Sequence, residues 1–341
     1  MKNSISPDRN VQPAVSIPDR VELPLAEVHN MAGGVKLYCL PAPGYGVVRV
    51  SFVFRAGSSW QDVPFCASAT ANNLAEGSST MTSQQIAETL DYYGSYFDVS
   101  IDRDWSVVTF VCLSKFFGQT MGLAREIVLD PIFPEEELRT YCDKSKQTLT
   151  INRMKVDFNA RELFSRSIYG AAHPYGVSSP AERYDDLTRD DVRRFYASHY
   201  TAANCFVVMS GDIDESHIRT VGELLAAMPT GDAGERPAFP EPCSISSAEM
   251  PFPDAVQSAI RVGRVMFPRS HPDFIGMQVV ASVLGGYFGS RLVRNLRAER
   301  SYTYGAYYAL LNAERVVYFV CATQVCVRLT AASVRHVVVV Y

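Results

Sequence analysis

The chain has 341 residues, of which 47% are hydrophobic, and its formal net charge at pH 7 is −4. This length predicts two domains of ordinary size, and the apolar fraction is large enough for substantial cores. Because both signs of charge are mixed and acids are in slight excess, the composition excludes the basic footprint of a nucleic-acid-binding protein.

The N-terminal segment, residues 1–20, is polar and contains prolines, and we expect a flexible arm there. It has no apolar core like that of a secretory signal peptide, and no run in the chain reaches the roughly 18 apolar residues of a membrane-spanning helix. We therefore expect a cytoplasmic protein without membrane contact. Eight cysteines without a C-x-x-C pair are typical of free, mostly buried thiols in a reducing compartment. They are Cys39, Cys66, Cys112, Cys142, Cys205, Cys243, Cys321 and Cys326.

In the first 228 residues, alternating apolar positions predict strands and amphipathic stretches predict helices. We expect strands within 33–44 and 47–60, a strand pair within 96–114, and a strand within 204–213. We expect helices within 66–79, 82–94, 115–130, 134–155, 157–170, 188–200 and 214–229. Thr82 or Ser83 can cap the second of these helices, and Gly94 ends it.

Residues 229–246 are rich in proline, glycine and charged residues, and they are the best candidate for an interdomain linker. Beyond them the pattern restarts. We expect a strand within 255–267, helices within 270–286 and 290–300, a strand pair within 301–325 and a capped helix start at Thr330.

The order of elements repeats, because each half begins with a strand, continues with helices and enters long alternating strands. We therefore predict an α+β fold of two repeated lobes, each an antiparallel sheet with helices packed on one side. The first lobe is expected at 21–228 and the second at 247–341. The second copy has fewer than half as many residues, so we expect an incomplete, truncated lobe with uncovered strand edges.

Four segments, taken in order, resemble the insulinase/pitrilysin family of zinc metallopeptidases. They are EGSSTMTSQQIAETLDYYGSYFDVSIDRDWSVVTF, DPIFPEEEL, HPYG with the later LTRDDVRRFYASHYTAANCFVVMSGDI, and LGGYFGSRLVRNLRAERSYTYGAYY. The resemblance implies two duplicated lobes that enclose a peptide-binding chamber. It also implies an inverted zinc motif, His-x-x-Glu-His on a helix, with a distant Glu as the third ligand and the motif Glu as general base.

The zinc motif is degenerate in this chain. Aligned by its Gly-Ser end, the stretch CASATANNLAEGSS has Ser68, Ala71 and Asn72 at the motif positions, and the third ligand falls near Thr148 or Leu149. None of these side chains is a good zinc ligand or base. None of the six histidines is followed by a Glu three residues on or has another His within a helical turn; they are His29, His173, His199, His217, His271 and His336. We expect this chain to bind no zinc and to contain no catalytic residue.

The resemblance also implies a substrate clamp on the lobe without metal, an Arg and a Tyr that reach the scissile peptide bond. The matching positions are Arg297 and Tyr304 in RNLRAERSYTYGAYY. A guanidinium fork and a phenol are suitable donors to developing negative charge. The residues also allow a purely structural interpretation, in which Arg297 belongs to a solvated basic helix face and Tyr304 belongs to a run of tyrosines that packs against a sheet.

Within this family, the chain resembles the non-zinc-binding partner subunit of a two-subunit bacterial-type processing peptidase. Our main hypothesis is a non-catalytic, substrate-binding subunit that forms a heterodimer with a separate zinc-bearing subunit and acts with it in peptide hydrolysis. Two alternatives stay open. The chain is a structural or peptide-binding pseudoenzyme subunit with no role in hydrolysis, or it is a truncated, non-functional copy.

Overall fold

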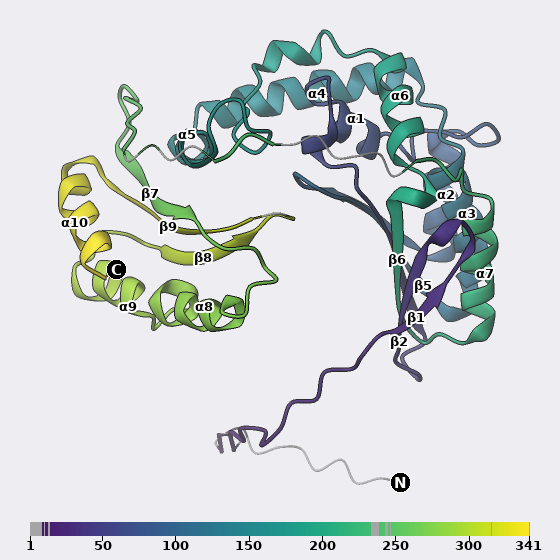
Figure 1. Ribbon diagram of the computed structural model, residues 1–341, viewed down its shortest axis with the longest axis horizontal. Coiled ribbons are helices and arrows are strands. Elements are labelled where there is room, and N and C mark those ends of the chain that lie inside the picture. Colours follow the sequence, from purple (N-terminus) through teal and green to yellow (C-terminus); the bar gives the residue numbers. More distant parts are fainter. Residues whose placement is uncertain are drawn as a thin grey trace.

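The computed structural model of the protein describes residue 9 and residues 11–12, 14–232, 239–242, 245, 247–314 and 316–340. Two lobes of unequal size face each other across an interlobe space (Figure 1). The predicted N-terminal arm and the predicted linker lie partly outside the described residues, as does Cys243. The lobe boundaries at 21–228 and 247–341 stay predictions.

The first lobe is built on a six-stranded sheet with the strand order β1-β2-β6-β3-β5-β4. The strands are β1 (Glu27–Asn30), β2 (Lys36–Pro41), β3 (Val47–Phe54), β4 (Tyr96–Ile101), β5 (Ser106–Leu113) and β6 (Cys205–Gly211). Every neighbouring pair is antiparallel except β2 and β6, which run parallel. A parallel pair needs a long crossover, and most of the lobe lies between these two strands in the sequence.

Helices cover one face of this sheet and one of its ends (Figure 1). They are α1 (Cys66–Asn72), α2 (Ser83–Tyr93), α3 (Phe117–Leu129), α4 (Glu135–Arg153), α5 (Val156–Tyr169), α6 (Arg189–His199) and α7 (Glu215–Ala226). The predicted start of α2 is confirmed, because Thr82 and Gln85 form a capping box and Gly94 ends the helix in the left-handed conformation. The core lies between sheet and helices, where the inward residues of β3 are at most 1% exposed.

The helix expected over 66–79 is shorter than predicted. It ends at Asn72, and Asn73 follows as the C-cap, with its backbone N–H and its side-chain amide both donating to the Ala69 carbonyl, at 3.1 and 2.8 Å. The chain then forms a tight turn, in which the Ser78 hydroxyl accepts from the Met81 N–H at 3.0 Å.

The second lobe has a three-stranded antiparallel sheet with the order β7-β9-β8. Its elements are β7 (Gln257–Val265), α8 (Phe274–Ala281), α9 (Arg291–Val293), β8 (Ala306–Asn312), β9 (Val317–Cys326) and α10 (Thr330–Val340). A π-helical turn follows α8 over Ser282–Gly286, and another follows α9 over Arg294–Glu299. The helices pack on one side of the sheet around a small core that contains Leu296, Tyr308 and Phe319.

The predicted α+β class and the repeat are confirmed, while the first sheet is mixed and not antiparallel throughout, because β2 and β6 run parallel. In the first lobe, β5 pairs with both β3 and β4, and in the second, β9 pairs with both β7 and β8. A helix follows the last of these strands in each lobe, α3 in the first and α10 in the second. Within the described residues, the second sheet contains no counterparts of β1, β2 and β6.

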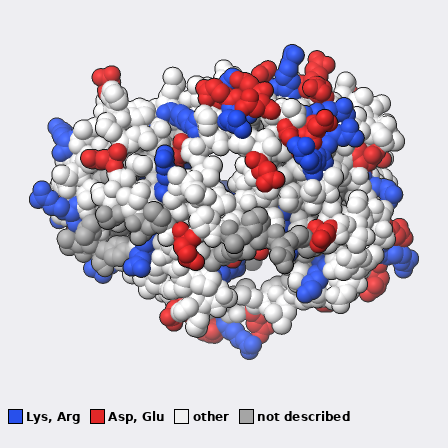
Figure 2. All heavy atoms as spheres, turned by 45° about the horizontal axis from the view of Figure 1, so that its top comes forward, with Lys and Arg blue, Asp and Glu red and all other residues white. Residues whose placement is uncertain are grey.

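The cysteines and the surface fit the expectations from composition. Five of the seven described cysteines are buried, while Cys205 is half-buried and Cys326 is exposed. Burial raises the pKa of the Cys66 thiol to about 12 and that of Cys39 to about 11, so neither is a reactive thiolate near neutral pH. Figure 2 shows acidic and basic side chains interspersed over one face of the molecule. None of the described helices is long and apolar enough to cross a membrane.

Candidate functional site

The three degenerate motif positions lie on α1, where their side chains serve the helix itself. The Ser68 hydroxyl donates to the Phe65 carbonyl at 2.9 Å, and the Asn72 amide donates to the Ser68 carbonyl at 2.8 Å. Ala71 has no exposed surface, and Asn72 is exposed. The arrangement is that of a packing helix, in which the polar side chains satisfy backbone carbonyls.

The third position faces the first across one cavity. Ser68 of α1 and Leu149 of α4 both line a cavity of about 430 Å³, together with Arg153 and Glu162. Thr148 does not line this cavity, and its hydroxyl donates to the Lys144 carbonyl at 2.8 Å. Of the two residues that the sequence left open, Leu149 is therefore the one that shares this cavity with Ser68.

These residues do not fit a zinc ion. The family motif has two imidazoles and two carboxylates at these positions. In this chain, the Ser68 hydroxyl and the Asn72 amide donate to their own helix, and the other two positions hold a buried methyl group (Ala71) and an isobutyl side chain (Leu149). Across the described part of the chain, no group of three or more His, Cys, Asp or Glu residues is placed to hold a metal ion.

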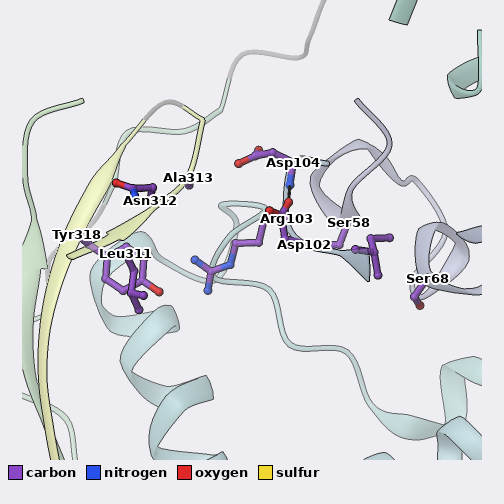
Figure 3. Close-up of a pocket in the computed structure, with 10 residues that line it drawn as sticks. Ser58, Ser68, Asp102, Arg103, Asp104, Leu311, Asn312, Ala313 and Tyr318 are labelled. Atoms are coloured by element: carbon purple, nitrogen blue, oxygen red, sulfur yellow. Dashed lines mark hydrogen bonds between the residues drawn. The ribbon is translucent and has the colours of Figure 1, made fainter. Parts of the chain in front are cut away.

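A second cavity of about 430 Å³ connects the motif helix to the other lobe. Ser58 and Ser68 line it from the first lobe, and Leu311, Asn312 and Tyr318 line it from β8 and β9. Figure 3 shows Arg103 between these two groups, with its side chain extended toward the second lobe. Ser68 of α1 therefore lies at a cavity that residues of both lobes line.

The two lobes meet in a polar and aromatic junction at the β4–β5 turn. Asp104 is 2% exposed, and its carboxylate accepts from the Glu314 N–H at 2.8 Å and from the Ser59 hydroxyl at 3.3 Å. It also accepts from the Tyr175 hydroxyl.

The Arg103 side chain completes this junction. Its guanidinium lies 5.4 Å from the ring centres of Tyr169 and Tyr175, which belong to the first lobe, and 5.9 Å from that of Tyr318 in the second. A cation stabilised by three rings in a partly desolvated site is favourable. Together with the Asp104 contacts, it holds the lobes at a defined spacing.

The two clamp residues lie in different surroundings. Arg297 is half-buried at the end of the turn after α9, and its guanidinium lies 4.1 Å over the ring centre of Phe288. Tyr304 is 92% exposed and lines a cavity of about 300 Å³ that also contains Asp157. Arg297 does not line this cavity.

Sequence reasoning missed the arginine that lies beside the Tyr304 cavity. Arg261 of β7 has only 8% of its side chain exposed, and it donates to Asp157 of α5 at 2.7 Å and to the Tyr307 hydroxyl at 3.2 Å. The sequence carries no signal for this role, because Arg261 lies between the core-facing Ile260 and Val262 and strand alternation therefore predicts an outward position for it.

Comparison with known proteins identifies related sequences and folds. Residues 186–333 match the family model described as "Peptidase M16 inactive domain". A Rickettsia bellii protein called "Uncharacterized zinc protease" is 22% identical over 291 residues, which are 82% of this chain and 69% of that protein. A Helicobacter pylori protein called "Non-peptidase homolog YmxG" is 22% identical over 276 residues, 79% of this chain and 63% of that protein.

Solved structures share the fold. A peptidase M16 inactive domain from Pseudomonas fluorescens has a TM-score of 0.86 and 24% identity, and the match covers 92% of this chain and 78% of that one. A protease from Helicobacter pylori has a TM-score of 0.79 and 14% identity, with 89% of this chain and 75% of that one covered.

Proposed function

Because this chain is an insulinase-type (M16) homologue of the inactive kind, we propose that it is the non-catalytic, substrate-binding subunit of a heterodimer. A separate, zinc-bearing M16 subunit is the proposed partner, and a peptide is the proposed substrate. Zinc in that partner would supply the activated water for hydrolysis. This chain would supply a surface that binds and orients the peptide.

The pairing of Ser68 with Leu149 across one cavity is the observation that carries this proposal. The resemblance assigns the metal site to this region, and Ser68 and Leu149, which line the cavity at the motif positions, cannot ligate zinc or activate water. A cavity whose motif positions lack the metal chemistry is expected of a subunit that binds substrate while another subunit reacts with it.

The second lobe supports a role in peptide binding. Tyr304 presents its phenol at a cavity with walls from both lobes, so the hydroxyl can donate to a peptide carbonyl there. Arg297 offers a planar fork of donors, and its stacking on Phe288 holds the guanidinium at the end of the neighbouring turn. We propose that both contact substrate when the partner completes the chamber.

A second function is favoured by the position of Arg297. Because its guanidinium lies on Phe288 and does not line the Tyr304 cavity, the pair is not assembled as a clamp in this structure. This arrangement suits a pseudoenzyme subunit that holds a peptide without any part in its hydrolysis.

Reconstitution separates the two functions. The purified chain is mixed with a zinc-bearing M16 subunit from the same organism, and cleavage of a quenched fluorescent peptide is followed. We expect no cleavage by the chain alone, cleavage by the mixture, and a collapse of the rate with Arg297→Ala or Tyr304→Phe. The matched controls are Arg291→Ala and Tyr287→Phe, which change exposed residues of the same lobe.

Two results would contradict the main proposal. Full activity of the isolated chain with bound zinc would show that it is itself the enzyme. A stable complex whose proteolysis does not respond to Tyr304→Phe, or that shows no proteolysis, would favour the pseudoenzyme function.

A further inference from the structure

The cavity beside Tyr304 is built by both lobes. Asp157, near the start of α5, forms its wall on the first lobe. The other polar side chains that line it come from the second lobe; they are Gln257, Thr303, Tyr304, Tyr307, Thr323 and Gln324. A ligand in this cavity therefore depends on how the lobes are placed relative to each other.

One buried guanidinium connects the two walls. Arg261 donates from one terminal nitrogen to the Asp157 carboxylate at 2.7 Å and from the other to the Tyr307 hydroxyl at 3.2 Å. The Arg261 side chain is 8% exposed and its bond to Asp157 is partly buried, where a charged hydrogen bond is stronger than at the surface, while its bond to Tyr307 is exposed.

We infer that Arg261 is a positioning residue for the Tyr304 cavity, which rests on the proposed function of Tyr304 in peptide binding. Tyr307 follows Tyr304 by three residues at the start of β8, so holding its hydroxyl orients the segment that carries Tyr304. Holding Asp157 at the same time fixes the opposite wall. Arg261 acts on the peptide through these two residues, and it does not line the cavity itself.

The charges around the cavity indicate which peptide it accepts. The Asp157 carboxylate is balanced by Arg261 at 2.7 Å and by Arg161 at 3.3 Å. The remaining polar side chains in the described lining are amides and hydroxyls. Two guanidiniums face one carboxylate, so the charge beside the cavity is net positive and disfavours a lysine there. The cavity therefore accepts a peptide segment with uncharged, hydrogen-bonding side chains such as glutamine or serine in preference to lysine.

The positioning role is tested in the free protein by ¹⁹F NMR after labelling with 3-fluorotyrosine. Tyr304→Phe and Tyr307→Phe assign the two signals. Arg261→Ala and Asp157→Asn should shift both signals, and Arg261→Lys, which keeps the charge, should shift them less. Arg264→Ala is the matched control, because it removes the same charge from an exposed position of the same strand. A Tyr304 signal unmoved by Arg261→Ala and by Asp157→Asn would overturn the positioning role, whether or not peptide binds.

Peptide selection is tested by fluorescence anisotropy with labelled peptides that differ only in one central residue, glutamine, lysine or glutamate. We expect the glutamine peptide to bind about tenfold more tightly than the lysine peptide, which corresponds to about 1.4 kcal/mol, and the glutamate peptide to bind no more weakly than the glutamine peptide. Arg261→Ala and Tyr304→Phe should each remove about that factor, and Arg264→Ala should not.

The outcomes are distinguishable. Equal affinities for the three peptides would overturn the selectivity. A loss of affinity with Arg261→Ala but not with Tyr304→Phe would support Arg261 and contradict the proposed role of Tyr304. If no peptide binds, the selectivity and the proposed function both fail, and the fluorine signals alone decide the positioning role.

Discussion

The carboxylate of Asp104 in the first lobe accepts a hydrogen bond of 2.8 Å from the backbone N–H of Glu314 in the second. The contact joins the turn between β4 and β5 to the turn between β8 and β9, and the carboxylate is almost fully buried. Since a buried carboxylate is stable only when its oxygens accept hydrogen bonds, this contact is a specific feature of how the lobes meet.

The first prediction concerns this contact. Asp104→Ala removes the acceptor for donors on both lobes and should lower the free energy of unfolding by about 1–3 kcal/mol. It should also raise the radius of gyration, because the lobes lose a point of attachment. Urea denaturation and small-angle X-ray scattering measure the two effects. Asp98→Ala, an exposed acid on β4, is the control and should change neither. An unchanged stability would show that the lobes are held elsewhere.

The second prediction concerns the close approach that supports the same turn. A Cβ atom on Gly57 would lie 2.4 Å from the Asp104 backbone nitrogen, so Gly57→Ala must displace the turn from the junction. We expect a loss of about 1–3 kcal/mol in thermal or urea unfolding. Gly118→Ala is the opposite case, because that Cβ would meet open space within α3. It should be stabilising by up to about 1 kcal/mol. A neutral Gly57→Ala would contradict the structure at the junction.

The third prediction concerns the motif helix. Ala71→Glu would restore the family's acidic residue at a position with no exposed surface, and it should destabilise the protein by about 2–4 kcal/mol. Asn72→Glu places the same acid one residue later at an exposed position, and it should be nearly neutral. The comparison is made by urea denaturation. Equal costs at the two positions would mean that α1 is oriented differently from this structure.

The fourth prediction concerns pH. Burial lowers the pKa of His199, and a weaker interaction with Asp62 opposes this shift. Its imidazole lies against the rings of Phe195 and Trp60. The unfolded chain, in which histidine has a pKa of about 6.5, therefore binds the proton more readily than the folded protein.

Stability that depends on neutral His199 should be fully present above the ordinary histidine pKa of 6.5 and should be lost as the pH falls from there toward the lowered pKa of the folded protein. His199→Gln should flatten the pH dependence of the unfolding free energy in this range. Parallel profiles for the wild-type protein and the variant would argue that His199 does not contribute to it.

The local elements could be predicted from sequence, because their signals are local. Alternation in VVRVSFVF marks β3, and the Thr82 and Gln85 pair marks the start of α2. The short edge strand β1 was missed, since four residues carry too little periodicity to be distinguished from a loop. The parallel pairing of β2 with β6 was also missed, because it joins segments far apart in the chain.

The candidate site could likewise be predicted only in part. The identities of Ser68, Ala71 and Asn72 suffice to exclude zinc ligation, because ligand chemistry follows from residue type. The bonds from Arg261 to Asp157 and Tyr307 could not be predicted, because they depend on how α5 of one lobe packs against the sheet of the other.

The place of β6 in the first sheet determines when that lobe can fold during synthesis. β6 lies between β2 and β3, pairing Lys36 with Phe206 and Phe54 with Cys205, so a strand from the centre of the sheet leaves the ribosome after all the others. Until then β2 and β3 each present an unpaired edge that can bind other chains. The lobe is therefore expected to fold late and slowly, and to need protection by chaperones while its first 200 or so residues are made.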